Sequence, residues 1–409
     1  MNDSALQIPN SEFVTPQSDA ITPLVARVMR IDETTWGTQK QNFQVRYRGK
    51  LLLDSAEAYD QLSQAVRQHQ MTPLFRMEEG RETILLLEGV LEPKPSNPWI
   101  NLILFIITIF SVLLAGALYA YDGAVSDNPL EMIRLVLGKL WTGWPFAVSL
   151  LAILLAHEFG HYTAARYHKS AVTLPYFLPF PLSVFGTMGA FIQLKEPPKN
   201  KKILLDIGAA GPYAGLVVAI PVLLFGLYTS KLHELPTYLI SGQGFEGNSI
   251  LYLLAKFAVF GEWLPKPADF QGMSPILYWL RYFFTGSPLP HGGLDVTLNQ
   301  VAWAGWAGLL VTALNLIPAG QLDGGHMLYV LFGSKARKLL PVILIGLVLL
   351  ALVWSGWWLW VVILLILGRF HAEPLDQITP LDPRRKAVAA FGLVLFVLLF
   401  MPVPLLTMM

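Results

Sequence analysis

The sequence predicts a polytopic α-helical membrane protein, with about six to seven transmembrane helices and a small N-terminal α+β soluble domain. Of its 409 residues, 54% are hydrophobic and only 14% are charged, whereas soluble domains carry about one quarter charged residues. Long apolar runs, several of them flanked by basic clusters, fill the chain after residue 98. The net charge of +1 gives no reason to expect a nucleic-acid partner. Because cysteine is absent, any metal must be held by His, Asp or Glu.

The part of the chain before the apolar runs is expected to be soluble. Residues 1–23 carry no Lys or Arg and lack the features of a signal or transit peptide, so we expect a disordered tail. Within 24–98, residues 43–48 alternate like a strand, 56–69 follow a capping serine as a helix, and two apolar runs around Glu79-Gly80 read as a hairpin. We expect a cytoplasmic α+β domain over 24–98.

Residues 99–409 form the expected transmembrane region. Long apolar runs of about twenty residues are typical of membrane-spanning helices. They predict spans at about 99–121, 144–167, 203–228, from about 298 onward, and at about 387–407. Two shorter apolar runs within 250–284 are expected to lie at the membrane interface rather than to span it.

The apolar run 339–367 is too long for one comfortable helix and short for two. Four tryptophans gather near its middle, around Ser355-Gly356, and tryptophan prefers the membrane–water interface. This favours a hairpin of two short helices. With such a hairpin the basic clusters all fall on one side of the membrane, which the positive-inside rule makes the cytoplasmic side.

The most informative motif is His157-Glu158-Phe159-Gly160-His161, which ends an apolar run that begins at Trp144. Two histidines four residues apart project from one face of a helix and can share one Zn²⁺ ion. Glu158 lies near the same face, where it can take a proton from the attacking water. Ionisable groups at such depth in a bilayer are costly and usually functional, so the sequence predicts a zinc protease that cuts inside the membrane.

A catalytic zinc needs three protein ligands and one open position. The best candidate for the third ligand is Asp323, in Leu322-Asp-Gly-Gly at the end of the fourth span, at the same expected depth as the histidine motif. A lone Asp before two glycines is otherwise typical of a turn. His326, three residues further on, is the rival ligand, or a hydrogen-bonding partner of a ligand.

Three further features of the sequence bear on the site. Asn315 is a polar residue in an apolar helix, where its amide orients substrate or bonds to a neighbouring helix. The small residues of 211–215, Gly-Pro-Tyr-Ala-Gly, are best explained by close helix packing. The strand-like segment 186–194 either holds an unwound substrate by β-addition or is a plain structural hairpin.

These motifs resemble those of the site-2 protease family of intramembrane zinc metalloproteases. The matching pieces, in order, are His157-Glu-Phe-Gly-His161, Gly211-Pro-Tyr-Ala-Gly215 and Asn315-Leu-Ile-Pro-Ala-Gly-Gln-Leu-Asp-Gly-Gly-His326. The Gly-Gly-His ending and the α+β domain look most like the plastid and cyanobacterial branch, and no PDZ-like domain is visible.

The resemblance implies a role for each site residue. It implies His157, His161 and Asp323 as zinc ligands, Glu158 as the base and Asn315 as a substrate-orienting group. It also implies a catalytic core of three helices, the second to the fourth, and regulated proteolysis of a membrane-anchored substrate.

We therefore expect a zinc metalloendopeptidase that hydrolyses peptide bonds within or near the transmembrane segments of single-span proteins. The alternatives are a non-catalytic metal-binding membrane scaffold and a metal transporter. We expect a multi-pass protein of a bacterial or archaeal plasma membrane, or a related internal membrane, with the active site toward the cytoplasm. The expected partners are the lipid bilayer and the substrate, and whether the chain forms a homo-oligomer stays open.

Overall fold

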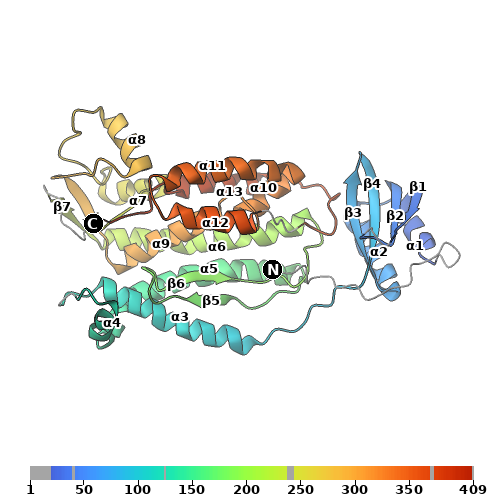
Figure 1. The fold of residues 1–409 in the computed structure, drawn as a ribbon, viewed down its shortest axis with the longest axis horizontal. Coiled ribbons are helices and arrows are strands. Elements are labelled where there is room, and N and C mark those ends of the chain that lie inside the picture. Colours follow the sequence, from blue (N-terminus) through green and yellow to red (C-terminus); the bar gives the residue numbers. More distant parts are fainter. Residues whose placement is uncertain (1–19, 39–41, 124–125, 237–243, 369–372, 408–409) are drawn as a thin grey trace.

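The structure is a computed structural model. It describes residues 20–407 except 39–41, 124–125, 237–243 and 369–372. Figure 1 shows an elongated molecule with a small sheet domain at one end and a long bundle of helices beside it. Most of the tail expected over 1–23 lies outside the described residues, but Thr22 already begins helix α1 (Thr22–Ala26).

The N-terminal domain is a four-stranded antiparallel sheet with helix α2 (Ser55–Val66) packed on it. The strands run in the order β1-β2-β4-β3. Their bounds are β1 Met29–Trp36, β2 Val45–Leu51, β3 Met71–Glu78 and β4 Arg81–Glu88. The predicted hairpin is confirmed: Glu79 and Gly80 both have positive φ, as a tight two-residue turn between twisted strands requires.

The first part of the bundle contains the long helices that the apolar runs predict. They are α3 (Pro98–Tyr119), α5 (Trp144–Tyr167) and α6 (Lys201–Tyr228), followed later in the chain by the shorter α9 (Gln300–Asn315). Among the described residues, three helices are long and apolar enough to cross a membrane: α3, α6, and α5 together with the turn that precedes it. Helices α5, α6 and α9 pack on one another, which is the predicted arrangement of the second, third and fourth spans.

The second part of the bundle is built from shorter helices. These are α10 (Asp323–Phe332), α11 (Leu340–Ala351), α12 (Trp357–Leu367) and α13 (Pro383–Leu399). Helices α11 and α12 pack against each other, so the hairpin predicted over 339–367 is confirmed. None of the four reaches the length of a comfortable span, and the count of six to seven spans stays a prediction.

The last predicted span, 387–407, is wrong at its C-terminal end. Helix α13 stops at Leu399, and Pro402 and Pro404 prevent its continuation because proline lacks the N–H that a helix needs. The chain then runs extended into β10 (Leu405–Thr407), which pairs with β8 (Gly244–Glu246).

A small module joins α6 to α9 at the end of the bundle opposite the N-terminal domain (Figure 1). We call it the distal module, meaning the described residues within 229–299 together with 400–407. Its first strand β7 (Lys231–Glu234) pairs with its last strand β9 (Leu294–Thr297). The two apolar runs predicted between them form α7 (Ile250–Phe260) and α8 (Pro275–Thr285). Their interfacial position stays a prediction.

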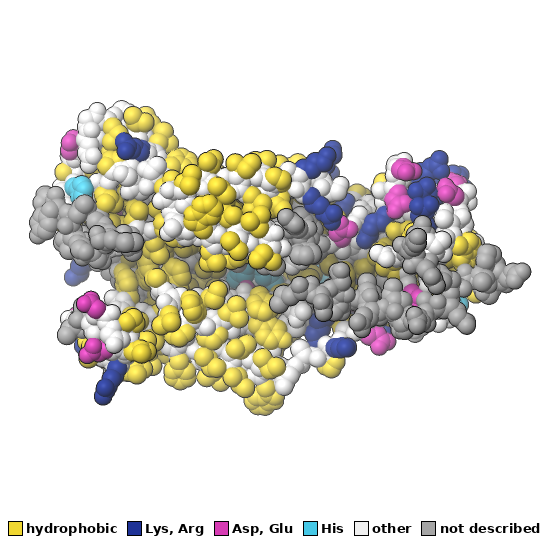
Figure 2. All heavy atoms as spheres, in the orientation of Figure 1, with side chains coloured by type: hydrophobic (Ala, Val, Ile, Leu, Met, Phe, Trp, Pro, Cys, Tyr) yellow, Lys and Arg dark blue, Asp and Glu magenta, His cyan; other side chains and the backbone are white. Residues whose placement is uncertain are grey.

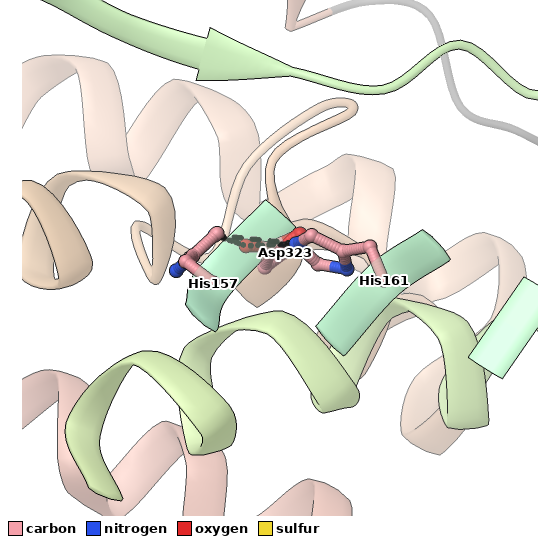
Figure 3. A group of neighbouring side chains, drawn as sticks. All are labelled: His157, His161 and Asp323. Atoms are coloured by element: carbon pink, nitrogen blue, oxygen red, sulfur yellow. Dashed lines mark hydrogen bonds and ion pairs between the residues drawn. The ribbon is translucent and has the colours of Figure 1, made fainter. Parts of the chain in front are cut away.

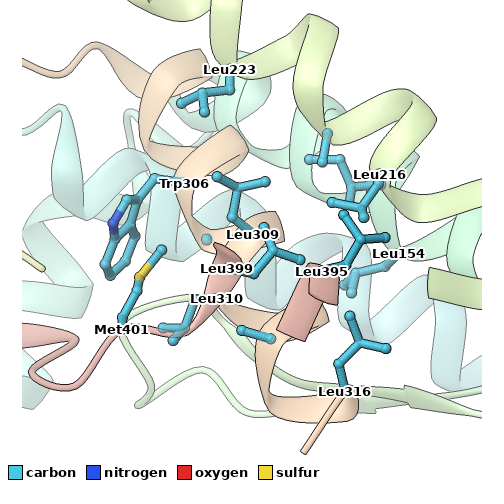
Figure 4. Close-up of a cluster of buried hydrophobic side chains, with 14 of the residues drawn as sticks. Leu154, Leu216, Leu223, Trp306, Leu309, Leu310, Leu316, Leu395, Leu399 and Met401 are labelled. Carbon is cyan, nitrogen blue, oxygen red and sulfur yellow. The ribbon is translucent and has the colours of Figure 1, made fainter. Parts of the chain in front are cut away.

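The surface of the bundle is a broad apolar belt. Figure 2 shows hydrophobic side chains over most of the helices, while charged side chains gather at the two ends. The bundle interior is close-packed: Figure 4 shows leucines of α5, α6, α9 and α13 gathered in one cluster, with Trp306 and Met401 at its edge. The apolar exterior fits a lipid environment, since soluble proteins rarely expose contiguous apolar patches larger than a few hundred Å².

The N-terminal domain is joined to the bundle by the segment 373–379. This segment bonds to the edge strand β3, through Phe75 N–H to the Leu375 carbonyl (2.9 Å) and Gln377 N–H to the Phe75 carbonyl (3.0 Å). Its other side bonds to the loop before α6, through Asp376 N–H to the Lys199 carbonyl (2.7 Å). The segment therefore covers an otherwise open sheet edge and connects it to the start of α6.

Candidate metal centre

Two histidines of α5 point from one face of the helix into the bundle. The helix begins at Trp144 with Pro145 in its first turn, a position where proline is well tolerated. Its apolar run keeps the chain helical up to His157 and His161, which are both buried, at 4% and 7% exposure. The ring atoms His157 Nε2 and His161 Nε2 lie 3.2 Å apart.

Asp323 reaches the same point from another element. It lies in the first turn of α10, after the loop that follows α9. The next two glycines make this possible: a Cβ on Gly324 would lie 1.9 Å from the Leu316 carbonyl oxygen, and one on Gly325 2.5 Å from that of Gly320. The start of α10 therefore folds back directly on the loop and carries Asp323 to the histidines.

The three side chains form a triangle that fits a zinc ion (Figure 3). Asp323 Oδ2 lies 3.3 Å from His157 Nε2 and 3.4 Å from His161 Nε2. Zinc bonds of about 2.0–2.1 Å in tetrahedral geometry place neighbouring ligand atoms about 3.3 Å apart. The donor set of two imidazoles and one carboxylate is also one that catalytic zinc uses, so the residues fit the metal in both chemistry and spacing.

Helix α6 holds the histidine rings in place. His161 Nδ1 donates to the backbone carbonyl of Ile207 at 2.7 Å, which leaves the Nε2 lone pair free for a metal. A Cβ on Gly211 would lie 2.0 Å from His161 Nε2, and one on Gly215 would lie 3.2 Å from His157 Nδ1. The glycines of 211–215 thus do serve close packing, and what packs on them is the pair of candidate ligands.

Glu158 lies beside the triangle on a small cavity of about 230 Å³. Its side chain is 4% exposed, and Oε2 has no hydrogen-bond partner among the described residues. The backbone N–H of Ile192 interacts with its carboxylate. Ile192 follows β6 (Thr187–Phe191), which pairs with β5 (Tyr176–Pro179). The strand-like segment predicted over 186–194 therefore lies on the same cavity as the candidate base.

The structure also brings Asn315 and His326 to this cavity. Asn315 Nδ2 lies 3.3 Å from His157 Nε2, a contact between α9 and α5 beside the candidate ligands, so both interpretations of its amide stay open. His326 packs its ring against α6, where a Cβ on Gly208 would lie 3.5 Å from His326 Cδ2. Within the described chain, the group of side chains close enough to share a metal contains Asp323 and not His326.

Sequence reasoning missed the parts of the site that come from the backbone. The Ile207 carbonyl and the Ile192 N–H have no sequence signature, because every residue carries these groups. Gly208 precedes the matched motif by three residues. The spacing of Gly208, Gly211 and Gly215, at helical intervals of three and four, was the signal available for the α6 face that receives the rings.

The fold and the site together define a metal centre of the metallopeptidase type inside an apolar helical bundle. A model of peptidase family M50 matches residues 145–353, which include all three candidate ligands, and the chain belongs to this family. One similar relative is a protein of Arabidopsis thaliana named as probable zinc metalloprotease EGY1, chloroplastic, which is 29% identical over 78% of this chain. A protein of the same name from Oryza sativa subsp. japonica is 31% identical over 78% of this chain.

A third relative, named as probable zinc metalloprotease EGY2, chloroplastic, from Oryza sativa subsp. indica, is 26% identical over 88% of this chain. The alignments cover 56%, 53% and 62% of these three relatives, so the chain spans little more than half of their length. The predicted family, its plastid-type branch and the zinc cofactor are confirmed. The names place the relatives in chloroplasts and give no support to the plasma-membrane location expected above.

Proposed function

We propose that this protein is an intramembrane zinc endopeptidase that cleaves single-span membrane proteins within or near their transmembrane segments. The observation that carries the proposal is the triangle of His157 Nε2, His161 Nε2 and Asp323 Oδ2 next to the buried Glu158 carboxylate. Figure 2 supports the intramembrane position: histidine and acidic side chains lie at the bottom of a hollow near the middle of the apolar belt.

His157, His161 and Asp323 would hold the zinc. When bound, zinc supplies a Lewis acid that polarises the scissile carbonyl and makes a water nucleophilic near neutral pH. Glu158 takes the proton of the attacking water through its unpaired Oε2 and later gives it to the leaving amine. The side-chain amide of Asn315 lies on the same cavity, where it donates to the substrate carbonyl oxygen and keeps it oriented for attack.

The substrate enters as an extended chain. A cavity of about 230 Å³ is too small for a helix, which is about 10 Å across with its side chains. Within the described part of the chain, β6 pairs with β5 alone, so its other edge is available. An unwound substrate segment can add to that edge through main-chain hydrogen bonds, which would lay its peptide bonds alongside Glu158.

The cellular role follows from the same features. A protease with its base and ligands inside the apolar belt acts on membrane-anchored proteins, and release of a fragment from such a protein is the chemistry of regulated intramembrane proteolysis. The likeness to chloroplastic relatives favours an internal membrane over the plasma membrane as the place where this chain acts.

The proposal is tested with the full-length protein in lipid nanodiscs and a panel of single-span peptides. We expect cleavage by the zinc-loaded protein, loss of cleavage with a chelator, and recovery on zinc addition. Glu158→Gln should keep zinc and lower the cleavage rate by about 10²–10⁴-fold, the usual contribution of a general base. The exposed carboxylate of Glu57 gives a matched control, and Glu57→Gln should cleave like the unchanged protein.

The alternatives give different results for the unchanged protein and for Glu158→Gln, in nanodiscs for the scaffold and in liposomes for the transporter. A metal-binding scaffold would hold zinc in both proteins and cleave with neither. A transporter would move zinc into liposomes, whether or not Glu158 is present as a base. Either outcome, or cleavage that persists in the chelated protein, would overturn the proposed mechanism.

A further inference from the structure

The distal module contains a second group of buried ionisable side chains, far along the bundle from the metal centre. Lys256 of α7 is fully buried and Asp295 of β9 is 5% exposed. Glu246 of β8 keeps some exposed surface, but its carboxylate Oε1 accepts a hydrogen bond from the buried Tyr252 hydroxyl at 2.9 Å. We call these four residues the distal cluster.

The charges of the distal cluster do not balance. Its two carboxylates face a single ammonium group, which leaves one negative charge in excess inside the protein when all are ionised. Lys256 Nζ lies 4.4 Å from the centre of the Tyr252 ring and has no hydrogen-bond partner among the described residues. A buried charge without a close partner is costly, and uptake of one proton by a carboxylate removes the excess.

Charged and titratable groups from the surrounding elements also face the cluster. They are His233 on β7, Tyr282 on α8 and Tyr119 on α3. His233 lies opposite Asp295 in the strand register, and its Nδ1 is 2.8 Å from the Thr297 hydroxyl. The two tyrosines are neutral in the physiological range, so His233 is the neighbour that the variants below must separate from Glu246.

The distal cluster is connected to the catalytic core at two places, through Gly247 and through strand β9. Gly247, which follows Glu246, accepts a hydrogen bond from Trp306 Nε1 of α9 at 2.8 Å and donates to the Pro404 carbonyl at 2.6 Å. Trp306 is fully buried and stacks on Trp303. Asp295 is linked even more directly, since β9 ends three residues before α9 begins. Helix α9 carries Asn315 at its other end.

We propose that the distal cluster is a proton-binding site. It holds one extra proton when the compartment on the distal side is acidic and releases that proton as the compartment becomes neutral. The release loosens the packing of α7 on α6 and α13 and the contact of Gly247, next to β8, with Trp306 of α9. The bond that forms is the O–H of the Glu246 carboxyl, and the proton comes from and returns to water. Through this change, the packing around α9 in the catalytic core responds to the pH of the compartment at the end of the bundle opposite the N-terminal domain.

The direction of the pH effect follows from the cluster's surroundings. Burial, and then the charge of Asp295, raise the pKa of Glu246 from its ordinary 4.5 to about 7, while burial lowers the pKa of Lys256. A carboxyl whose pKa is raised by folding stabilises the folded module fully below its unfolded pKa, and this contribution is lost as the pH rises through about 7. The tightly packed form of the distal module is therefore favoured at acidic pH.

Hydrogen–deuterium exchange of the full-length protein in nanodiscs tests this inference without any cleavage assay. Protection of the backbone amides of 244–260 and 294–299 is measured between pH 5 and pH 8 and corrected for the intrinsic exchange rate. If local opening exposes Glu246, protection should fall with rising pH, by up to about 70-fold, the ceiling that linkage sets for a shift from 4.5 to about 7. Peptides of the N-terminal sheet give the internal reference.

Variants identify the group that titrates. Glu246→Gln should remove most of the pH dependence, because the amide is neutral throughout. Glu262→Gln, which changes a partly exposed carboxylate of the same module, and His233→Gln should both keep it. Asp295→Asn should move the midpoint to lower pH, since Lys256 then faces one carboxylate. Protection that is independent of pH in the unchanged protein, or a dependence that disappears with His233→Gln but survives Glu246→Gln, would overturn the inference.

Discussion

Gly211→Ala is the sharpest test of how the metal centre is built. The added methyl group would lie 2.0 Å from His161 Nε2, the atom that faces the metal, whereas an ordinary contact needs at least 3.4 Å. The imidazole must therefore recede by more than 1 Å. Zinc bond lengths vary by only about 0.2 Å, so we expect the variant to lose bound zinc and, with it, cleavage.

The same change should leave the fold intact. Alanine stabilises a helix interior by about 1 kcal/mol relative to glycine, and the atoms that must move belong to a side chain and not to the backbone. Zinc content by mass spectrometry and thermal unfolding of the zinc-free protein separate the two effects. We expect a zinc affinity at least about tenfold lower, the size of loss seen when groups that orient a ligand are removed, with an unchanged or slightly higher melting temperature.

Two glycines give matched controls. Gly346→Ala in α11 meets no atom within 4 Å and should change neither zinc nor cleavage. Gly215→Ala places its methyl 3.2 Å from His157 Nδ1, so it should weaken zinc binding less than Gly211→Ala does. Full zinc occupancy in Gly211→Ala, at the affinity of the unchanged protein, would refute the view that α6 sets the position of the ligands.

Two further predictions concern the third ligand and the domain contact. Asp323→Ala should lose zinc, whereas His326→Gln should retain it, and metal content at limiting zinc decides between the two candidates; the reverse result would make His326 the ligand. The buried carboxylate of Asp376 accepts hydrogen bonds from the Ser55 hydroxyl (2.8 Å) and the Ile378 N–H (2.8 Å). Asp376→Ala removes this acceptor and should destabilise the contact between the N-terminal domain and the bundle by about 1–3 kcal/mol. Faster hydrogen exchange in 71–78 would report this loss, and unchanged exchange there would contradict it.

Much of the fold was predictable because it follows from local pattern. The long apolar runs, the alternation of the strands and the turn at Glu79-Gly80 are properties of neighbouring residues, and the structure has the corresponding elements. The end of α13 was mistaken because an apolar composition was followed past Pro402 and Pro404. The β7–β9 and β8–β10 pairs join segments about 60 and 160 residues apart, and such pairings leave no local signature.

The chemistry of the site was predictable where it resides in side chains with a fixed spacing. His157 and His161 could be placed on one helix face from the 3.6-residue period alone. Asp323 could be inferred only because zinc chemistry requires another ligand. The distal cluster could not be inferred, since Glu246, Lys256 and Asp295 lie up to about 50 residues apart in the sequence, and Lys256 is a single charge in the apolar run that forms α7. Only the fold shows that they are brought together and buried.

The charges of the metal centre explain why a lipid-embedded bundle can hold these groups. With neutral histidines, the carboxylates of Asp323 and Glu158 give the site two negative charges, a costly arrangement in an apolar interior. A divalent cation held by His157, His161 and Asp323 brings the sum to zero. When Glu158 then accepts the proton of the attacking water, its charge is neutralised as negative charge develops on the substrate carbonyl oxygen, so the total within the belt stays constant. Glu158 is not among the three side chains that would hold the ion, so replacing it with a neutral amide should spare zinc binding and impair the chemical step, because an amide does not take up the proton of the attacking water.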